Sequence, residues 1–179
     1  MAKRSFDIGK LIKVSNKKIF YEKHDNFVFL SDNRGYVVLQ TKEDDILSDL
    51  EKRGVELTEK AGLNQIVKTA MNKYQPEEMF SYIDTGICFP YYDHTVGKRK
   101  ILTMFRDYNE MYSVKLADTA YTTIFKPVMI TGGKSKNDPI VMICPDCFGI
   151  IMPIMVSRNY VTDQKENIKQ LMDYFNTFW

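Results

Sequence analysis

Two cysteines separated by two residues form the sharpest chemical pattern in this chain. In Cys144-Pro145-Asp146-Cys147, two thiols have a spacing that can bind a metal ion or close a redox disulfide. A zinc site needs four ligands, and only Cys88, His94 and His24 remain to complete one. A redox pair is usually activated by a helix amino terminus, whereas strand-like sequence flanks this one. The pattern favours a two-residue hairpin turn between strands, flanked by two small buried thiols.

Imidazole and carboxylate groups provide little else that could act as a catalytic pair. Asp93 could orient His94 for general-base chemistry, but no activated nucleophile lies nearby in the sequence. The acidic cluster Glu43, Asp44, Asp45 and Asp49 falls in the first turns of a predicted helix, where it favours a solvated face. We therefore expect a protein without catalytic residues, resident metal or cofactor.

Basic and aromatic residues recur together near the predicted turns and strand ends. A net charge of +2 is too small to define a partner, so only the local distribution is informative. Such groups can hold an anionic partner while aromatic rings contact bases or a protein groove, although an ordinary solvated surface is the alternative. The candidate partner-binding residues are Lys17, Lys18, Arg34, Tyr36, Tyr92, Lys98, Arg99, Lys100, Arg106, Lys134 and Lys136.

Hydrophobic segments and turn residues in the first half predict the elements that position some of these side chains. Residues 17–40 predict a three-stranded antiparallel meander, with turns at 24–25 and 32–35. Hydrophobic residues at helical spacing predict helices over 42–53 and from about 62 to 75. Two central helices therefore follow the meander.

The second half returns to strand-like sequence. Asp118 can begin a short helix there, and Ile168, Leu171, Met172 and Phe175 predict a C-terminal amphipathic helix that opens at Thr162-Asp163. At the other end of the chain, residues 5–14 predict irregular structure or a short helix. The predicted strands of this half are 80–89, 98–106, 111–116, 127–131, 138–144 and 147–155.

The order of these elements predicts the fold class. Strands, two helices, more strands and one helix, without regular alternation, favour α+β with a mainly antiparallel sheet. The 179 residues, 44% hydrophobic and 27% charged, suit one domain over 1–179, with a seam near 75–76 between an N-terminal lobe and a β-rich lobe. Three cysteines and no membrane-length apolar run predict a cytoplasmic protein.

The closing strands carry a local resemblance. The run from Phe125 to Met155, FKPVMITGGKSKNDPIVMICPDCFGIIMPIM, resembles the closing strands of a bacterial sliding-clamp domain, where a proline-led strand precedes a hairpin ending in a Met-Pro pair. The earlier part of the chain departs from that pattern because it has no clear clamp-type helix before its strands. The resemblance implies a clamp-like, DNA-associated accessory or regulatory protein.

The whole chain also resembles the small accessory proteins, rich in lysine, asparagine and tyrosine, of phages and plasmids of low-GC Gram-positive bacteria. The opening KRSFDIGKLIKVSNKKIFY shows this character. That group includes anti-CRISPR proteins, which implies a non-enzymatic inhibitor that occupies a type II RNA-guided nuclease or its guide-RNA complex and blocks DNA binding or cleavage. We expect a protein partner in the host cytoplasm, with nucleic acid as the alternative. A small zinc-dependent enzyme using Cys88, Cys144 and Cys147 is the third hypothesis.

Overall fold

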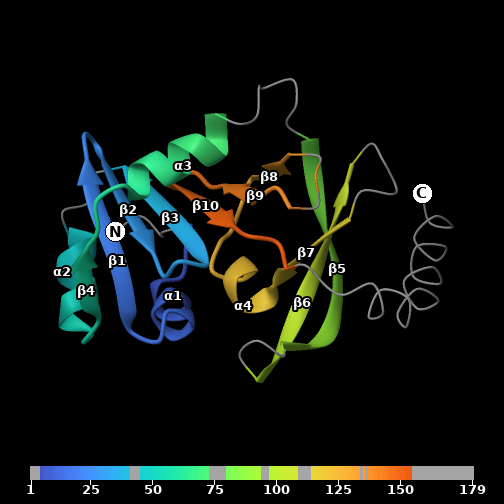
Figure 1. Cartoon of the computed structure of the whole chain (residues 1–179), viewed down its shortest axis with the longest axis horizontal. Coiled ribbons are helices and arrows are strands. Elements are labelled where there is room, and N and C mark those ends of the chain that lie inside the picture. Colours follow the sequence, from blue (N-terminus) through green and yellow to red (C-terminus); the bar gives the residue numbers. More distant parts are fainter. Residues whose placement is uncertain are drawn as a thin grey trace, which may run out of the picture.

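The chain forms one large twisted sheet with helices on both faces (Figure 1). The computed structural model describes residues 5–40, 45–72, 80–93, 97–108, 114–133, 135 and 137–154. Within them, ten strands join in the order β4-β1-β2-β3-β10-β9-β8-β5-β6-β7, all antiparallel except the pair β1–β4. The predicted α+β class with a mostly antiparallel sheet is therefore confirmed. The predicted C-terminal helix lies outside the described residues.

The predicted N-terminal meander is present as three consecutive antiparallel strands. These are β1 (Lys18–His24), β2 (Phe27–Ser31) and β3 (Gly35–Gln40). Asp25 takes a positive φ of 50° in the first turn. In the second turn, the Asp32 carboxylate accepts hydrogen bonds from the backbone N–H groups of the two residues that lead into β3. Both breaks expected from the sequence are therefore turns.

Two central helices follow the meander, as predicted. They are α2 (Asp45–Lys52) and α3 (Leu63–Asn72), and Gly54, with φ of 73°, follows the end of α2. The sequence did not predict β4 (Glu56–Glu59), which lies between these helices and pairs in parallel with β1. Its four residues are mostly polar and exposed, so they carry no hydrophobic strand pattern. None of the helices in the described ranges is long and apolar enough to cross a membrane.

Two shorter helices pack together beside the sheet. Of the two structures predicted for residues 5–14, the short helix is present as α1 (Ile8–Val14), capped by the Asp7 side chain. The helix predicted after Asp118 is α4 (Thr119–Thr122), and the Asp118 carboxylate accepts the Ala120 N–H at 3.0 Å. The Asp7 amide, just before α1, donates to the carbonyl oxygen of Ile124, just after α4, at 2.7 Å.

The second half of the chain supplies the remaining six strands, each of which overlaps a predicted segment. Their bounds differ: β5 continues four residues beyond the predicted end at 89, and β10 ends at Ile151, before the predicted end at 155. One of them, β10, pairs with β3, so the sheet runs through both halves of the chain on either side of residues 75–76. The six strands are β5 (Phe80–Asp93), β6 (Lys98–Asp107), β7 (Val114–Asp118), β8 (Met129–Gly132), β9 (Ile140–Ile143) and β10 (Cys147–Ile151).

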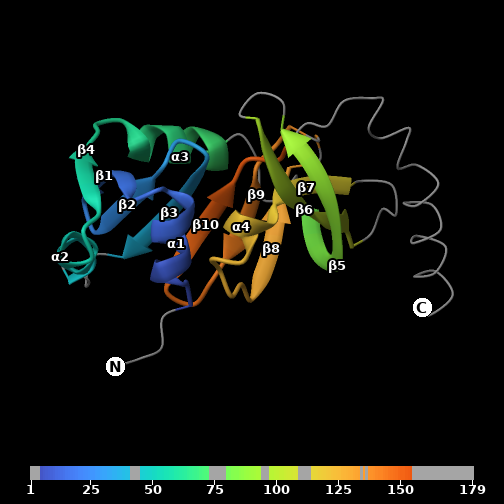
Figure 2. The ribbon, with the colours of Figure 1, turned by 90° about the horizontal axis from the view of Figure 1, so that it is seen from below.

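The sheet has two unequal hydrophobic faces, which we name the core face and the α3 face. On the core face, residues such as Leu30 and Met142 pack in one cluster with side chains from α1, α2 and α4. On the α3 face, a smaller cluster joins Phe29 and Ile150 to Leu63 and Val67 of α3. Figure 2 shows α3 and α1 on opposite sides of strands β1–β3.

Candidate functional site

Strands β5 and β6 form a long hairpin that carries several of the predicted partner-binding residues. The pairing shifts register between Asp84 and Cys88, so β5 contains a bulge there. Gly86 in the bulge has φ of 70°, and its N–H donates to the Asp84 side chain at 2.8 Å. Before the bulge β5 pairs with β8, but only over residues 80–82. The outer half of the hairpin therefore extends beyond the pairing with β8.

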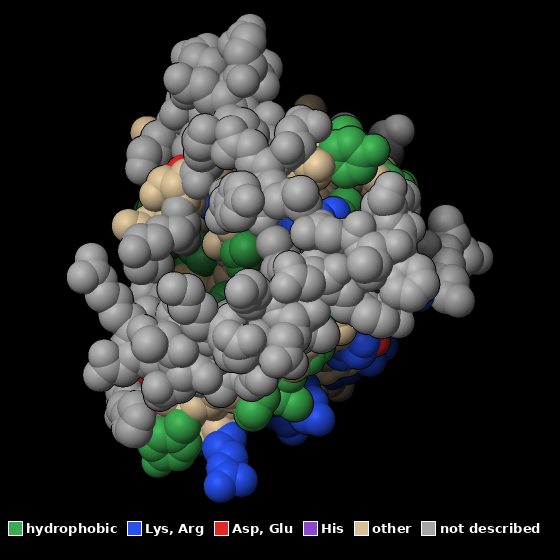
Figure 3. All heavy atoms as spheres, turned by 90° about the vertical axis from the view of Figure 1, so that its right-hand side faces the viewer, with side chains coloured by type: hydrophobic (Ala, Val, Ile, Leu, Met, Phe, Trp, Pro, Cys, Tyr) green, Lys and Arg blue, Asp and Glu red, His purple; other side chains and the backbone are tan. Residues whose placement is uncertain are grey.

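One face of the outer hairpin is exposed over most of its length, although Thr103, which pairs with Cys88 at the inner end, is buried. Residues directly opposite in an antiparallel pair point to the same side, so register places five exposed side chains together. Tyr92 is 47% exposed and Ile101 is 55% exposed. Figure 3 shows hydrophobic side chains beside Lys and Arg along the lower end of the molecule, where Figure 1 places the hairpin turn. We call this surface the hairpin face: Cys88, Pro90, Tyr92, Arg99 and Ile101.

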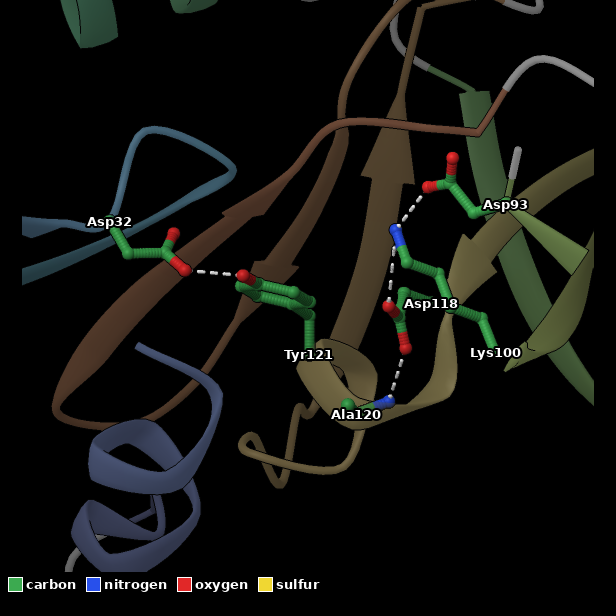
Figure 4. A network of polar contacts seen from close by, with 6 residues as sticks. All are labelled: Asp32, Asp93, Lys100, Asp118, Ala120 and Tyr121. Atoms are coloured by element: carbon green, nitrogen blue, oxygen red, sulfur yellow. Dashed lines mark hydrogen bonds and ion pairs between the residues drawn. The ribbon is translucent and has the colours of Figure 1, made fainter. Parts of the chain in front are cut away.

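The opposite side of the hairpin is anchored to the rest of the protein. Phe89 and Leu102 are buried there. Lys100 Nζ lies 2.7 Å from Asp93 Oδ2 and 3.9 Å from Asp118 Oδ2, and all three side chains are largely buried (Figure 4). Lys100 is therefore an internal cation that joins both hairpin strands to the residue capping α4.

A second polar contact fixes the other side of α4. The Tyr121 hydroxyl donates a hydrogen bond to Asp32 in the β2–β3 turn (Figure 4). Burial raises the pKa of Tyr121 above its ordinary value, and the hydrogen bond to Asp32 acts in the same direction. The phenol therefore remains a protonated donor at neutral pH. Helix α4 thus lies between the β2–β3 turn and the hairpin and holds polar contacts with both.

The structure groups only part of the predicted partner-binding set. Lys98 is exposed at the hairpin turn, close in sequence to Arg99 of the hairpin face. Lys18 pairs with Glu56 at 3.5 Å, and sheet order puts five strands between β1 and β5. The other predicted partner-binding residues lie apart or fall on undescribed positions: Lys17 precedes β1, Arg34 lies in the β2–β3 turn, Tyr36 is in β3, Arg106 is half-buried in β6, and Lys134 and Lys136 are outside the described residues. His94, considered above as a metal ligand, is also outside them.

The cysteine pattern forms the predicted hairpin turn. The Cys144 N–H donates to the Cys147 carbonyl at 3.0 Å, and both side chains are buried. Burial raises the pKa of Cys147 to about 12 and also raises the pKa of Cys144. Cys88 is exposed on β5, where its sulfur lies 3.8 Å from the Thr103 hydroxyl. Among the residues with described positions, no three His, Cys, Asp or Glu side chains gather as a metal site.

Lys115 is a buried cation that sequence reasoning missed. Its side chain in β7 is only 1% exposed, and Nζ donates to the carbonyl oxygens of Ser135 and Asp138, each at 2.6 Å. Burial lowers the Lys115 pKa from 10.5 to about 8, although the nearby Asp138 carboxylate opposes the shift. Tyr82 donates to the Gly133 carbonyl at 2.9 Å. The side chains of Lys115 and Tyr82 therefore both bind backbone carbonyl groups between β8 and β9. No local signal marked the burial of Lys115, because in VKLAD the apolar Val114 and Leu116 alternate with it, whereas the structure buries positions 115 and 117.

No protein-family model matches the chain, and neither a curated protein nor a solved structure shows significant similarity to it.

The hairpin and its turn bring together four of the predicted partner-binding residues: Tyr92, Lys98, Arg99 and Lys100. Three of these are exposed and the fourth anchors the hairpin. The hairpin face is therefore the candidate functional site.

Proposed function

We propose that this protein is a non-enzymatic binding protein that contacts its partner through the hairpin face. The observation that carries the proposal is the register of β5 and β6, which aligns Pro90 with Ile101 and Tyr92 with Arg99 on one exposed side. Tyrosine and arginine are enriched among the residues that contribute most to protein interfaces. The anchored opposite side supports the proposal because a preorganised surface loses less conformational entropy on binding.

The chemistry of the hairpin face fits a protein better than a bare nucleic acid strand. Arg99 and Lys98 supply positive charge near the turn, but Pro90 and Ile101, the next pair along the hairpin face, are apolar. Groups that follow a phosphate backbone form a positively charged groove with stacking rings, whereas a protein interface combines an apolar centre with a polar rim. We therefore infer a partner that presents an apolar surface bordered by carboxylates.

A type II RNA-guided nuclease is the first partner to test. The resemblance of the chain to accessory proteins of phages and plasmids supports this choice, and it implies an inhibitor acting in the cytoplasm of the bacterial host. Under this proposal the protein occupies the nuclease, or its complex with guide RNA, and prevents DNA binding or cleavage. No chemical step by the inhibitor is required.

The experiment combines capture with a purified cleavage assay. Purified full-length protein is mixed with a type II nuclease and guide RNA, and target-DNA cleavage is measured with increasing inhibitor. We expect complex formation and lost cleavage for the native chain, and at least tenfold weaker inhibition for the variant Tyr92→Ala/Ile101→Ser. The matched control is Ile66→Ser, which removes another exposed isoleucine, on α3.

Three results would contradict the proposal. Undiminished cleavage at molar excess would remove the nuclease as the partner. Equal inhibition by the hairpin variant and the native chain would remove the hairpin face. Tight binding to DNA alone, weakening steeply between low and moderate salt, would instead favour the clamp-like accessory protein.

We also infer that the C-terminal segment forms the amphipathic helix that its sequence predicts. Ile168, Leu171, Met172 and Phe175 recur at helical spacing and would share one face. Thr162-Asp163 provides a suitable start because both side chains can accept hydrogen bonds from free N–H groups. A helix with one apolar face normally gains its stability by packing that face against another element.

A further inference from the structure

An apolar row crosses the α3 face without a cover among the described residues. Met129 on β8 pairs with Ile143 on β9, which pairs with Phe148 on β10. These three side chains therefore point to the same side of the sheet. Ile83 extends the row onto β5, because it follows Tyr82, the last β5 residue paired with β8. We call Ile83, Met129, Ile143 and Phe148 the uncovered row.

The uncovered row lies next to the part of the sheet that α3 covers. Ile150 lies two residues from Phe148 on the same face and is buried against α3 side chains. Phe148 is 41% exposed and Met129 is 52% exposed, whereas Ile83 and Ile143 are half-buried. Adjacent apolar residues on four neighbouring strands form a contiguous surface of the kind that marks a packing or binding site.

Beside the row lies a hydrogen-bond donor that requires a partner. Arg106 on β6 pairs with Ile83, and its Nε is buried. Among the described residues, that Nε has no hydrogen-bond acceptor. A buried donor without an acceptor is unfavourable by about 1–3 kcal/mol, so a segment covering this end of the row should bring a polar oxygen.

The C-terminal segment has the matching features. If residues 162–179 are helical, Gln164 shares a face with Ile168, Leu171 and Phe175, because these positions are separated by four, three and four residues. The Gln164 side chain carries a carbonyl oxygen, which can accept from Arg106. On this face of the helix, Gln164 therefore comes first, and the apolar stripe of Ile168, Leu171 and Phe175 follows it.

The end of the described chain places this segment within reach. The Ile154 N–H donates to the Leu116 carbonyl at 2.7 Å, so the chain leaves the sheet beside β7. Strands β7 and β9 are four strand spacings apart, roughly 19 Å along the sheet. Residues 155–161 span up to about 25 Å when extended. A helix entering from β7 meets Arg106 first and Phe148 last, the same order as Gln164 and Phe175.

We propose that residues 162–179 pack as an amphipathic helix on the uncovered row. In this arrangement Gln164 accepts a hydrogen bond from Arg106 Nε, and the stripe from Ile168 to Phe175 covers Met129, Ile143 and Phe148. The proposal rests on the inferred C-terminal helix and is independent of the partner bound by the hairpin face.

Photo-crosslinking of the full chain tests this packing. The photoreactive residue p-benzoylphenylalanine replaces Phe148, or Phe27 as the control, and mass spectrometry locates the products. Phe27 is a matched position because it is also a phenylalanine on a strand and is 37% exposed. A mixture of isotope-labelled and unlabelled protein distinguishes crosslinks within a chain from those between chains. We expect intrachain crosslinks to residues 164–175 from position 148 and none to them from position 27.

Hydrogen exchange provides a second readout in the same full-length protein. We expect Phe148→Asp to accelerate exchange of amides 164–175 at least tenfold, and Phe27→Asp to leave them unchanged. Crosslinks from position 148 that join two chains would show that a second copy occupies the row and would overturn the proposal. Absence of crosslinks to 164–175, or equal exchange in both variants, would also overturn it.

Discussion

The hydroxyl of Tyr121 in α4 donates a hydrogen bond to Asp32 in the β2–β3 turn. These residues belong to segments 89 positions apart, and α4 also meets the β5–β6 hairpin through Asp118 and Lys100. One four-residue helix therefore joins the β2–β3 turn to the β5–β6 hairpin. The orientation of the hairpin face depends on this connection.

Removing the Tyr121 hydroxyl should destabilise the protein. Tyr121→Phe keeps the buried ring but removes the hydroxyl donor to the Asp32 carboxylate, which keeps its two backbone donors in the β2–β3 turn. We expect the free energy of unfolding to fall by about 1–2 kcal/mol in urea denaturation. Tyr108→Phe, at a well-exposed tyrosine, should change it by less than about 0.5 kcal/mol. Equal effects of the two substitutions would show that the contact with Asp32 is not stabilising.

Neutralising Lys100 should loosen the hairpin. Lys100→Met leaves Asp93 and Asp118 as two largely buried carboxylates without their shared cation. We expect a loss of about 2–3 kcal/mol and faster hydrogen exchange over residues 88–102. Adding Asp93→Asn should recover part of this loss, because it removes one of the two like charges. Lys98→Met, at the exposed neighbouring turn position, should leave both measurements unchanged.

The burial of Lys115 should appear in the pH dependence of stability. Its pKa is about 8 in the folded chain, against the ordinary lysine value of 10.5 expected for the unfolded chain. Below pH 8 both states carry the proton, so the folded state bears the cost of the buried charge. Between pH 8 and 10.5 the unfolded chain binds more protons, and stability therefore rises with pH. The full rise attributable to Lys115 is on the order of 3 kcal/mol.

Comparison with Lys115→Met isolates this contribution. The raised pKa of Cys147 acts in the opposite direction above pH 9, but both proteins carry that thiol. Urea unfolding at pH 7, 8, 9 and 10 should show the native chain gaining stability relative to Lys115→Met across the upper part of this range. Parallel stability curves for the two proteins would mean that Lys115 is not desolvated as described.

The three cysteines should react at very different rates. Cys88 is exposed, whereas Cys144 and Cys147 are buried with raised pKa values. Because the thiolate is the reactive form, iodoacetamide at pH 8 should alkylate Cys88 at least a hundredfold faster. Peptide mass spectrometry over time measures the order, and denaturant should make the three rates similar. Early labelling of Cys147 in the folded protein would contradict its burial.

Local sequence signals predicted much of the framework. Asp118 marked the start of α4, and Pro145-Asp146 marked the turn between β9 and β10, because capping and turn formation depend on a few adjacent residues. The parallel strand β4 was missed because its pairing with β1 depends on the tertiary fold and not on its own polar sequence.

The candidate site was predictable only in part. Tyr92 and Arg99 were selected by residue type, but their position on one face follows from the register of β5 and β6 and from a bulge that the sequence does not mark clearly. Lys100 was expected on the surface with them. Its pairing with Asp118 arises because β6 lies beside β7, a neighbour relation that no local pattern specifies.

The pairing of β3 with β10 has a consequence for synthesis of the chain. Leu39 of β3 pairs with Cys147 of β10. More than a hundred further residues must therefore leave the ribosome before β10 can pair with β3, the last strand of the meander. Until then the outer backbone groups of β3 can pair with another nascent chain. Such distant contacts slow folding, because a large loop must close before the strands can join. Chaperone dependence during translation should therefore concentrate on the first forty residues.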